Sequence, residues 1–133
     1  MREEKIEYIR NWIFRANEDY AVIKSLEKSG IESYTSTICF HAQQAVEKYF
    51  KAFLIYNDID FPRTHDVDYL VLECKKIDDE NFDFDLKSLT EFGVSVRYPD
   101  DLYIPILRSC LRAFYPLLSI LAPILLSLSS MNW

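Results

Sequence analysis

Apolar residues recur at alternating spacings of three and four through the first part of the chain, which is the period of helices that pack in a bundle. The first series is Ile6, Ile9, Ile13, Ala16, Tyr20 and Ile23, and the second is Ile38, Ala42, Ala45, Tyr49, Ala52 and Tyr56. Ser29 and Gly30 separate the two series, so the first helix is expected to run from about Glu3 to Lys28. The second helix has the wider apolar arc, which predicts a central place in the bundle.

Shorter elements are expected after the second helix. Residues 57–66 contain a proline and polar turn formers, and Thr64 or Asp66 is expected to cap a third helix that starts near Asp66. Residues 78–85, DDENFDFD, are expected to form a solvated loop because five of the eight are acidic. A fourth helix is expected before Pro99, with the apolar residues Leu86, Leu89, Phe92 and Val96. The predicted fold is all-α, an up-and-down bundle of four to five helices.

Composition narrows the classes of function. The 133 residues fit one domain, and 21 acidic against 15 basic residues give a net charge of −6, which disfavours bulk nucleic-acid binding. Only two glycines are present, too few for a Gly-rich phosphate loop. Three cysteines without a Cys-x-x-Cys pair indicate neither a zinc site nor a disulfide framework, so we expect them to be reduced and buried. Neither a metal nor another cofactor is predicted.

The C-terminal segment differs in character from the bundle expected over residues 1–112. Residues 113–133 carry no charged side chain and are rich in leucine and isoleucine, so we expect them to belong to the same domain or to form the interface of a homodimer. Their length, serines and two prolines make a poor membrane span, and no membrane association is predicted. An alternative is that residues 106–133 are a frame-shifted end. The charged N-terminus lacks the apolar core of a secretory signal, which favours a cytoplasmic location.

A polar stripe on the second predicted helix is a candidate site. His41, Gln44 and Lys48 lie at i, i+3 and i+7, so they share one face, with Glu47 and Lys51 beside them. One interpretation is that the stripe is the solvent edge of the helix. The other is that it faces a groove and contacts phosphate or base through charge-assisted hydrogen bonds.

His65 is also open to two interpretations. It precedes the third predicted helix and therefore suits a capping turn. Together with His41 it also makes a pair of imidazoles suited to acid/base cleavage of a phosphodiester. In the binding interpretation His65 and Arg97 line the groove that the polar stripe faces.

Three segments of the sequence resemble the HEPN family (higher eukaryotes and prokaryotes nucleotide-binding). They are FHAQQAVEKYFKAFL at residues 40–54, RTHDVDYL at residues 63–70 and RYPDD at residues 97–101. The resemblance covers about residues 5–112 and implies a bundle similar to the C-terminal domain of kanamycin nucleotidyltransferase, usually dimeric. Family members often act beside a small nucleotidyltransferase, and some are RNA-cleaving toxins.

The RNA-cleaving members carry an Arg followed, after four to six residues, by a His. Arg97 matches that Arg, but Leu102, Tyr103 and Ile104 occupy the positions where the His would stand. The resemblance therefore implies no catalytic residue in this chain.

Binding is expected instead of cleavage. Arg97 offers a planar fork to a phosphate, Tyr98 or Tyr103 a ring to stack on a base, and Asp100 or Asp101 an acceptor for base or ribose. We expect a non-catalytic nucleotide-binding module that acts with a small nucleotidyltransferase. The alternatives are an RNA-cleaving toxin of a toxin–antitoxin pair that uses displaced histidines, and a module for interaction or oligomerisation alone.

Overall fold

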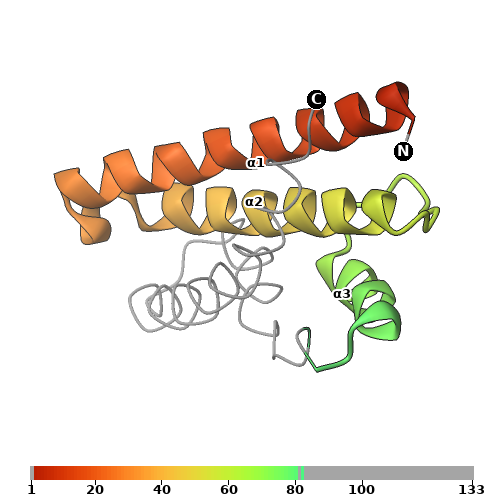
Figure 1. Cartoon of the computed structure of the whole chain (residues 1–133). Helices are drawn as coiled ribbons and strands as arrows, with labels where there is room; N and C mark the ends of the chain where they lie inside the picture. Colours follow the sequence, from red (N-terminus) through yellow and green to blue (C-terminus); the bar gives the residue numbers. More distant parts are fainter. Residues whose placement is uncertain (1, 81, 83–133) are drawn as a thin grey trace.

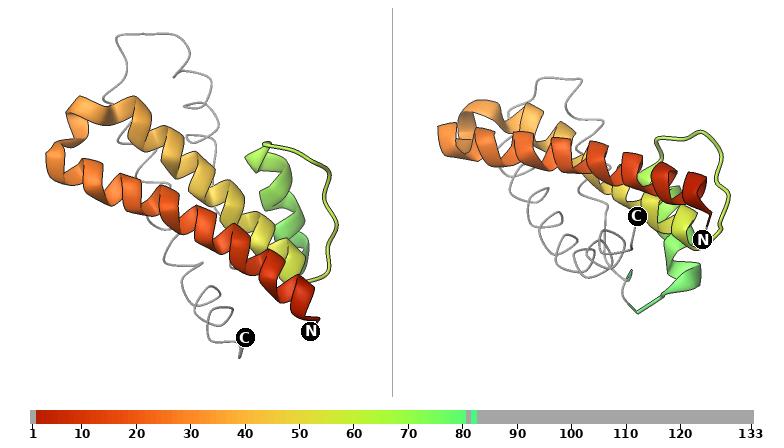
Figure 2. Two further views of the ribbon diagram at one scale, coloured as in Figure 1. Left: turned by 90° about the horizontal axis from the view of Figure 1, so that it is seen from above. Right: turned by 45° about the horizontal axis from the view of Figure 1, so that its top comes forward.

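The computed structural model describes residues 2–80 and 82, and the elements in this part are all helical (Figure 1). α1 spans Glu3–Ser29, the short 3-10 helix η1 spans Ile31–Tyr34, α2 spans Thr35–Tyr56 and α3 spans Val67–Ile77. α1 and α2 lie side by side in opposite directions, and α3 packs against α2 (Figures 1 and 2). The all-α prediction is confirmed.

The helix boundaries follow from local chemistry at their ends. Gly30 ends α1 with φ of 109°, a left-handed conformation that a side chain disfavours, and its N–H donates to the carbonyl of Glu27 at 3.2 Å. At the start of α3 the carboxylate of Asp66 accepts from the N–H of Tyr69 at 3.2 Å. The hydroxyl of Thr64 accepts from the N–H of Asp66 at 3.0 Å. Asp66 is therefore the N-cap of α3, and Thr64 holds Asp66 in place through its hydrogen bond.

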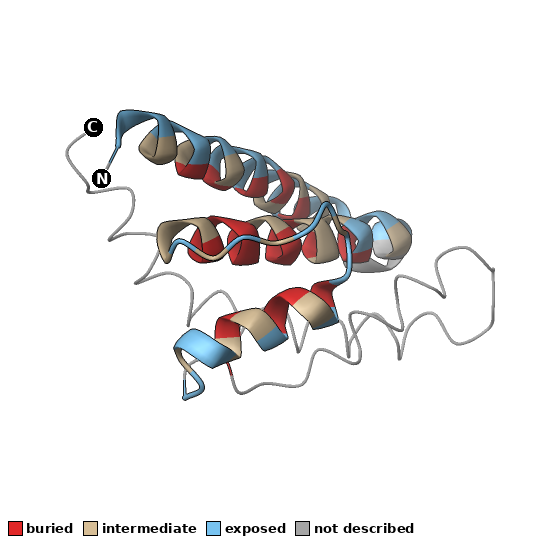
Figure 3. Ribbon diagram, turned by 90° about the vertical axis from the view of Figure 1, so that its right-hand side faces the viewer, coloured by how far each residue is buried: buried red, intermediate tan, exposed pale blue. Residues whose placement is uncertain are grey.

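α2 is the central helix of the described part. Buried positions occur around much of its circumference, whereas α1 buries one stripe along its length (Figure 3). The main core cluster joins α2 to both neighbours and includes Ile23, Phe50, Leu54 and Leu70. Among the described helices, this arrangement agrees with the central place predicted from the wide apolar arc of α2.

The acidic segment after α3 is only partly solvated. Asp79 and Glu80 are exposed as expected, but Phe82 is completely buried. Its ring centroid lies 4.7 Å from that of Phe53 and 6.0 Å from that of Phe50. The prediction of a solvated loop was therefore wrong for Phe82, which anchors the segment to α2.

Two cysteines fulfil the expectation of buried thiols. Cys39 and Cys74 are buried thiols, and burial raises the pKa of the Cys74 thiol far above its ordinary value, with a smaller contribution from Glu73. The third cysteine, the expected fourth helix and residues 113–133 lie outside the described residues. Among the helices of the described part, none combines the length and apolar character needed to cross a membrane.

Candidate functional site

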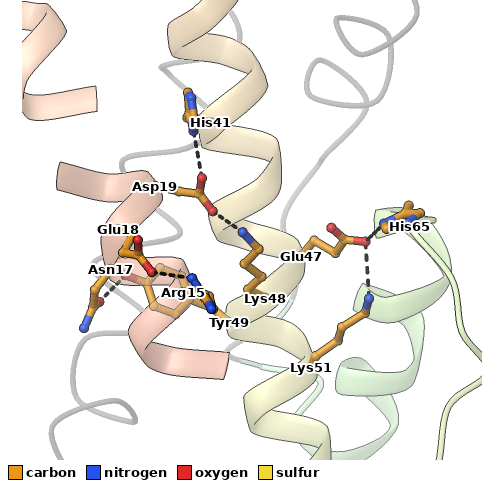
Figure 4. A network of polar contacts seen from close by, with 10 residues as sticks. All are labelled: Arg15, Asn17, Glu18, Asp19, His41, Glu47, Lys48, Tyr49, Lys51 and His65. Atoms are coloured by element: carbon orange, nitrogen blue, oxygen red, sulfur yellow. Dashed lines mark hydrogen bonds and ion pairs between the residues drawn. The ribbon is translucent and has the colours of Figure 1, made fainter. Parts of the chain in front are cut away.

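A carboxylate on α1 joins two members of the polar stripe on α2. Asp19 is 7% exposed; its Oδ1 lies 2.7 Å from His41 Nδ1, and its Oδ2 accepts from Lys48 Nζ at 2.6 Å (Figure 4). The side chains of His41 and Lys48 remain 24% and 22% exposed. We call these three residues the Asp19 cluster. It places a partly exposed imidazole and a partly exposed ammonium group around one buried acid.

The helical spacing of α1 explains why Asp19 is buried. It stands three residues after Ala16 and four before Ile23, both of which are completely buried, so it lies on the apolar stripe itself. The expected stripe passed through Tyr20, which is only partly buried. A polar residue at an apolar position was the available sequence signal, and sequence reasoning missed it.

Other polar side chains lie close to the Asp19 cluster. The hydroxyl of Tyr49 donates to Asn17 Oδ1 at 2.7 Å. Burial raises the pKa of Tyr49 to about 12, with smaller contributions from the negative charges that Tyr20 and Asp19 can carry.

The ring of Phe40 is half-exposed, and its centroid lies 5.4 Å from that of His41. Phe40 thus offers an exposed aromatic surface next to the imidazole, and the sequence analysis did not single it out.

A second buried acid, Glu47 on α2, forms a separate set of contacts. Glu47 Oε1 accepts from Lys51 Nζ at 3.3 Å and lies 2.7 Å from His65 Nδ1 (Figure 4). The side chains of Glu47 and Lys51 are 3% and 6% exposed, whereas that of His65 is 84% exposed. We call these three residues the Glu47 cluster. It ties the segment before α3 to the middle of α2.

Aromatic rings surround the buried ammonium of the Glu47 cluster. Lys51 Nζ lies 4.9 Å from the ring centroid of Trp12 and 5.9 Å from that of Phe61. Ring faces attract a cation, and this attraction is stronger where water is excluded. Lys51 is thus held by one carboxylate and by two rings from α1 and the loop after α2.

The structure divides the predicted site residues into three groups. His41 and Lys48 are brought together by Asp19, and Gln44 is partly buried on the same helix. His65 instead contacts Glu47, while Thr64 and Asp66 make the capping hydrogen bonds. The remaining predicted residues, Arg97, Tyr98, Asp100, Asp101 and Tyr103, lie outside the described residues.

The stripe on α2 is more than a solvent edge. Glu47 and Lys51 are buried, and His41 and Lys48 contact a buried acid of the neighbouring helix. An ammonium held in place with part of its surface exposed is suited to contact a phosphate, and the imidazole held beside it offers a further polar contact to a ligand. Within residues 2–80 and 82 there is no group of three or more His, Cys, Asp and Glu side chains arranged to hold a metal ion.

Comparison with known proteins agrees with this helical arrangement. Residues 9–113 match the HEPN domain. The chain is also 37% identical over 107 residues to a Methanocaldococcus jannaschii protein named "Putative toxin MJ1304", a match that covers 74% of this chain and 68% of the relative. No solved structure matches the chain. With an all-helical fold and a family match over most of its length, the chain belongs to the HEPN domain family.

Proposed function

We propose that this chain is a nucleotide-binding HEPN module with a toxin-like role, and that it acts with a small nucleotidyltransferase partner. The Asp19 cluster, whose Lys48 and His41 point from α2 to one buried acid, is the observation that carries the binding part. The toxin-like role is supported by the name of the M. jannaschii relative. The partner is the one that the family resemblance implies.

The surface around the Asp19 cluster suits a nucleotide in three ways. Lys48 supplies a charged donor for a phosphate, and His41 supplies a second polar contact. The half-exposed ring of Phe40 next to His41 is available to stack on a base. We assign the remaining phosphate contact to Arg97, which matches the family motif in sequence.

Nucleotide affinity is expected to depend on Lys48 and Arg97. Replacing either residue with alanine removes one charge-assisted contact to phosphate, so affinity for AMP, ADP or ATP should fall about ten- to hundredfold. Isothermal titration calorimetry with the three nucleotides measures this change. Lys76→Ala is the matched control, because Lys76 is an exposed lysine of α3 that pairs with Glu73.

Two results of this titration would contradict the proposed site. Equal affinities for the wild type, Lys48→Ala and Arg97→Ala would place nucleotide binding elsewhere. A wild type that binds none of the three nucleotides would leave an interaction module as the better description of the chain.

RNA cleavage by displaced histidines is a second candidate function. One observation favours it. His41 and His65 each contact a buried carboxylate through Nδ1, at 2.7 Å in both cases. This contact orients an imidazole and leaves its Nε2 for a substrate, as general acid/base catalysis requires. The two imidazoles belong to different clusters, however, and the sequence lacks the His that follows the Arg in the RNA-cleaving members of the family.

The purified protein is expected not to cleave RNA. Its net charge of −6 disfavours RNA binding, and the His expected after Arg97 is missing. Incubation with total and structured RNA, analysed on denaturing gels, measures cleavage for the wild type and for a His41→Ala, His65→Ala double variant. Cleavage by the wild type that disappears in the double variant would establish the ribonuclease instead.

A further inference from the structure

The Asp19 cluster specifies which nitrogen of His41 carries a proton. An ionised carboxylate accepts hydrogen bonds and donates none, and each oxygen of Asp19 has its own partner. Oδ2 accepts from the Lys48 ammonium, so the contact between Oδ1 and His41 Nδ1 requires a proton on Nδ1. In the neutral imidazole the other nitrogen, Nε2, is then an acceptor.

The same contacts fix the direction of both stripe residues. The His41 ring extends away from Asp19 beyond the bonded nitrogen, so Nε2 is not the atom that meets the acid (Figure 4). Lys48 uses one of its three donors on Oδ2, which leaves two for another acceptor. One carboxylate thereby aligns an acceptor, His41 Nε2, and a donor, Lys48 Nζ, which lie about two turns apart on the same face of α2.

We infer that Asp19 is the positioning residue of the nucleotide site, which holds His41 in the Nδ1–H form and keeps the Lys48 ammonium beside it. The inference rests on the proposed function for the identity of the ligand. In this arrangement His41 Nε2 accepts a hydrogen bond from a hydroxyl or amine of the nucleotide, and Lys48 donates to its phosphate. Asp19 touches neither group of the ligand and acts through the other two residues.

The opposite role for Asp19 makes a different prediction. If this acid only neutralised Lys48 and His41, its removal would free positive charge and tighten the binding of an anion. If it positions them, removal weakens binding although a repulsive negative charge has been lost. The sign of the change in affinity therefore separates positioning from charge compensation.

Asp19→Asn is the variant that tests this inference. The carboxamide has only one acceptor oxygen, so Lys48 and His41 Nδ1 can no longer each donate to an oxygen of their own. We expect affinity for AMP, measured by calorimetry, to fall about tenfold. We also expect ¹⁵N NMR of the imidazole to show the Nδ1–H form of His41 in the wild type and a loss of that preference in the variant. Glu18→Gln is the matched control, because Glu18 is the neighbouring acid but is exposed and pairs with Arg15 at 3.1 Å.

Several outcomes would overturn the inference. Unchanged or tighter AMP binding by Asp19→Asn would do so, as would an equal loss in Glu18→Gln. The Nε2–H form in the wild type would overturn it without any variant, so the test does not depend on the folding of Asp19→Asn. If the wild type binds none of AMP, ADP and ATP, the proposed function fails and the binding role of Asp19 fails with it, whereas the NMR result still shows whether Asp19 sets the form of His41.

Discussion

Replacing Lys51 with methionine is expected to lower the free energy of unfolding by about 3 kcal/mol. The methionine side chain has a similar length and fills most of the same space, so the change mainly removes a charge. Among the residues that the structure describes, the exposed His65 would then be the one partner left to Glu47, whose side chain is 3% exposed. A buried carboxylate with too little compensation is costly, and the attraction of the Trp12 and Phe61 rings for the ammonium is lost as well.

Two further variants make this experiment specific. Lys76→Met removes an exposed lysine that pairs with Glu73 at 2.7 Å, and it should change the unfolding free energy much less than Lys51→Met does. A Glu47→Gln, Lys51→Met double variant removes both buried charges and should recover at least half of the loss. Urea denaturation of the four proteins measures these differences. Equal effects of Lys51→Met and Lys76→Met would show that the Glu47 cluster does not stabilise the fold through its buried charges.

Helical periodicity predicted the described α-helices because the residues of an apolar stripe lie three or four positions apart within one stretch of sequence. The spacings of three and four located α1 within one residue at its C-terminus, and Asp66 was one of two caps named for α3. The central place of α2 was also predictable, because a helix that contacts more neighbours needs a wider apolar arc. These features can be predicted without knowing which helices are neighbours in the fold.

The partners within the site could not be predicted in this way. Periodicity shows that His41 and Lys48 share a face, but their common partner Asp19 stands 22 and 29 residues away on another helix. The contact between Glu47 and His65 spans 18 residues and a loop. Such pairs depend on how the helices are rotated and offset against one another, which the spacing within one helix does not determine.

Burial of charged residues was the hardest property to predict from sequence. Lys51 stands next to residues of the polar stripe, and lysine is a residue type that is usually exposed. Its burial depends on Glu47 one turn away and on rings supplied by α1 and by the loop after α2. Phe82 shows the reverse case, because the acids around it indicated a solvated loop although its own ring is in the core.

Removal of the Phe82 ring is expected to be about as damaging as the loss of the Lys51 charge. Phe82→Ala should lower the free energy of unfolding by about 3 kcal/mol, because a fully buried phenyl group is lost and a cavity remains. The cavity would lie against the rings of Phe50 and Phe53, which contact Phe82 from α2. The segment after α3 would also lose its attachment to the core, so its amide protons should exchange faster with solvent.

Phe14→Ala is the matched control for this prediction. Phe14 is the same residue type but is 62% exposed on α1, so its removal should change the unfolding free energy by about 0.5 kcal/mol or less. Urea denaturation gives the two free energies, and hydrogen exchange gives the protection of residues 78–80. If Phe82→Ala is no more destabilising than Phe14→Ala, the ring of Phe82 does not anchor the acidic segment to α2. Faster exchange confined to this segment, together with a loss of about 3 kcal/mol, would instead identify the Phe82 ring as the side chain that joins it to the helical core.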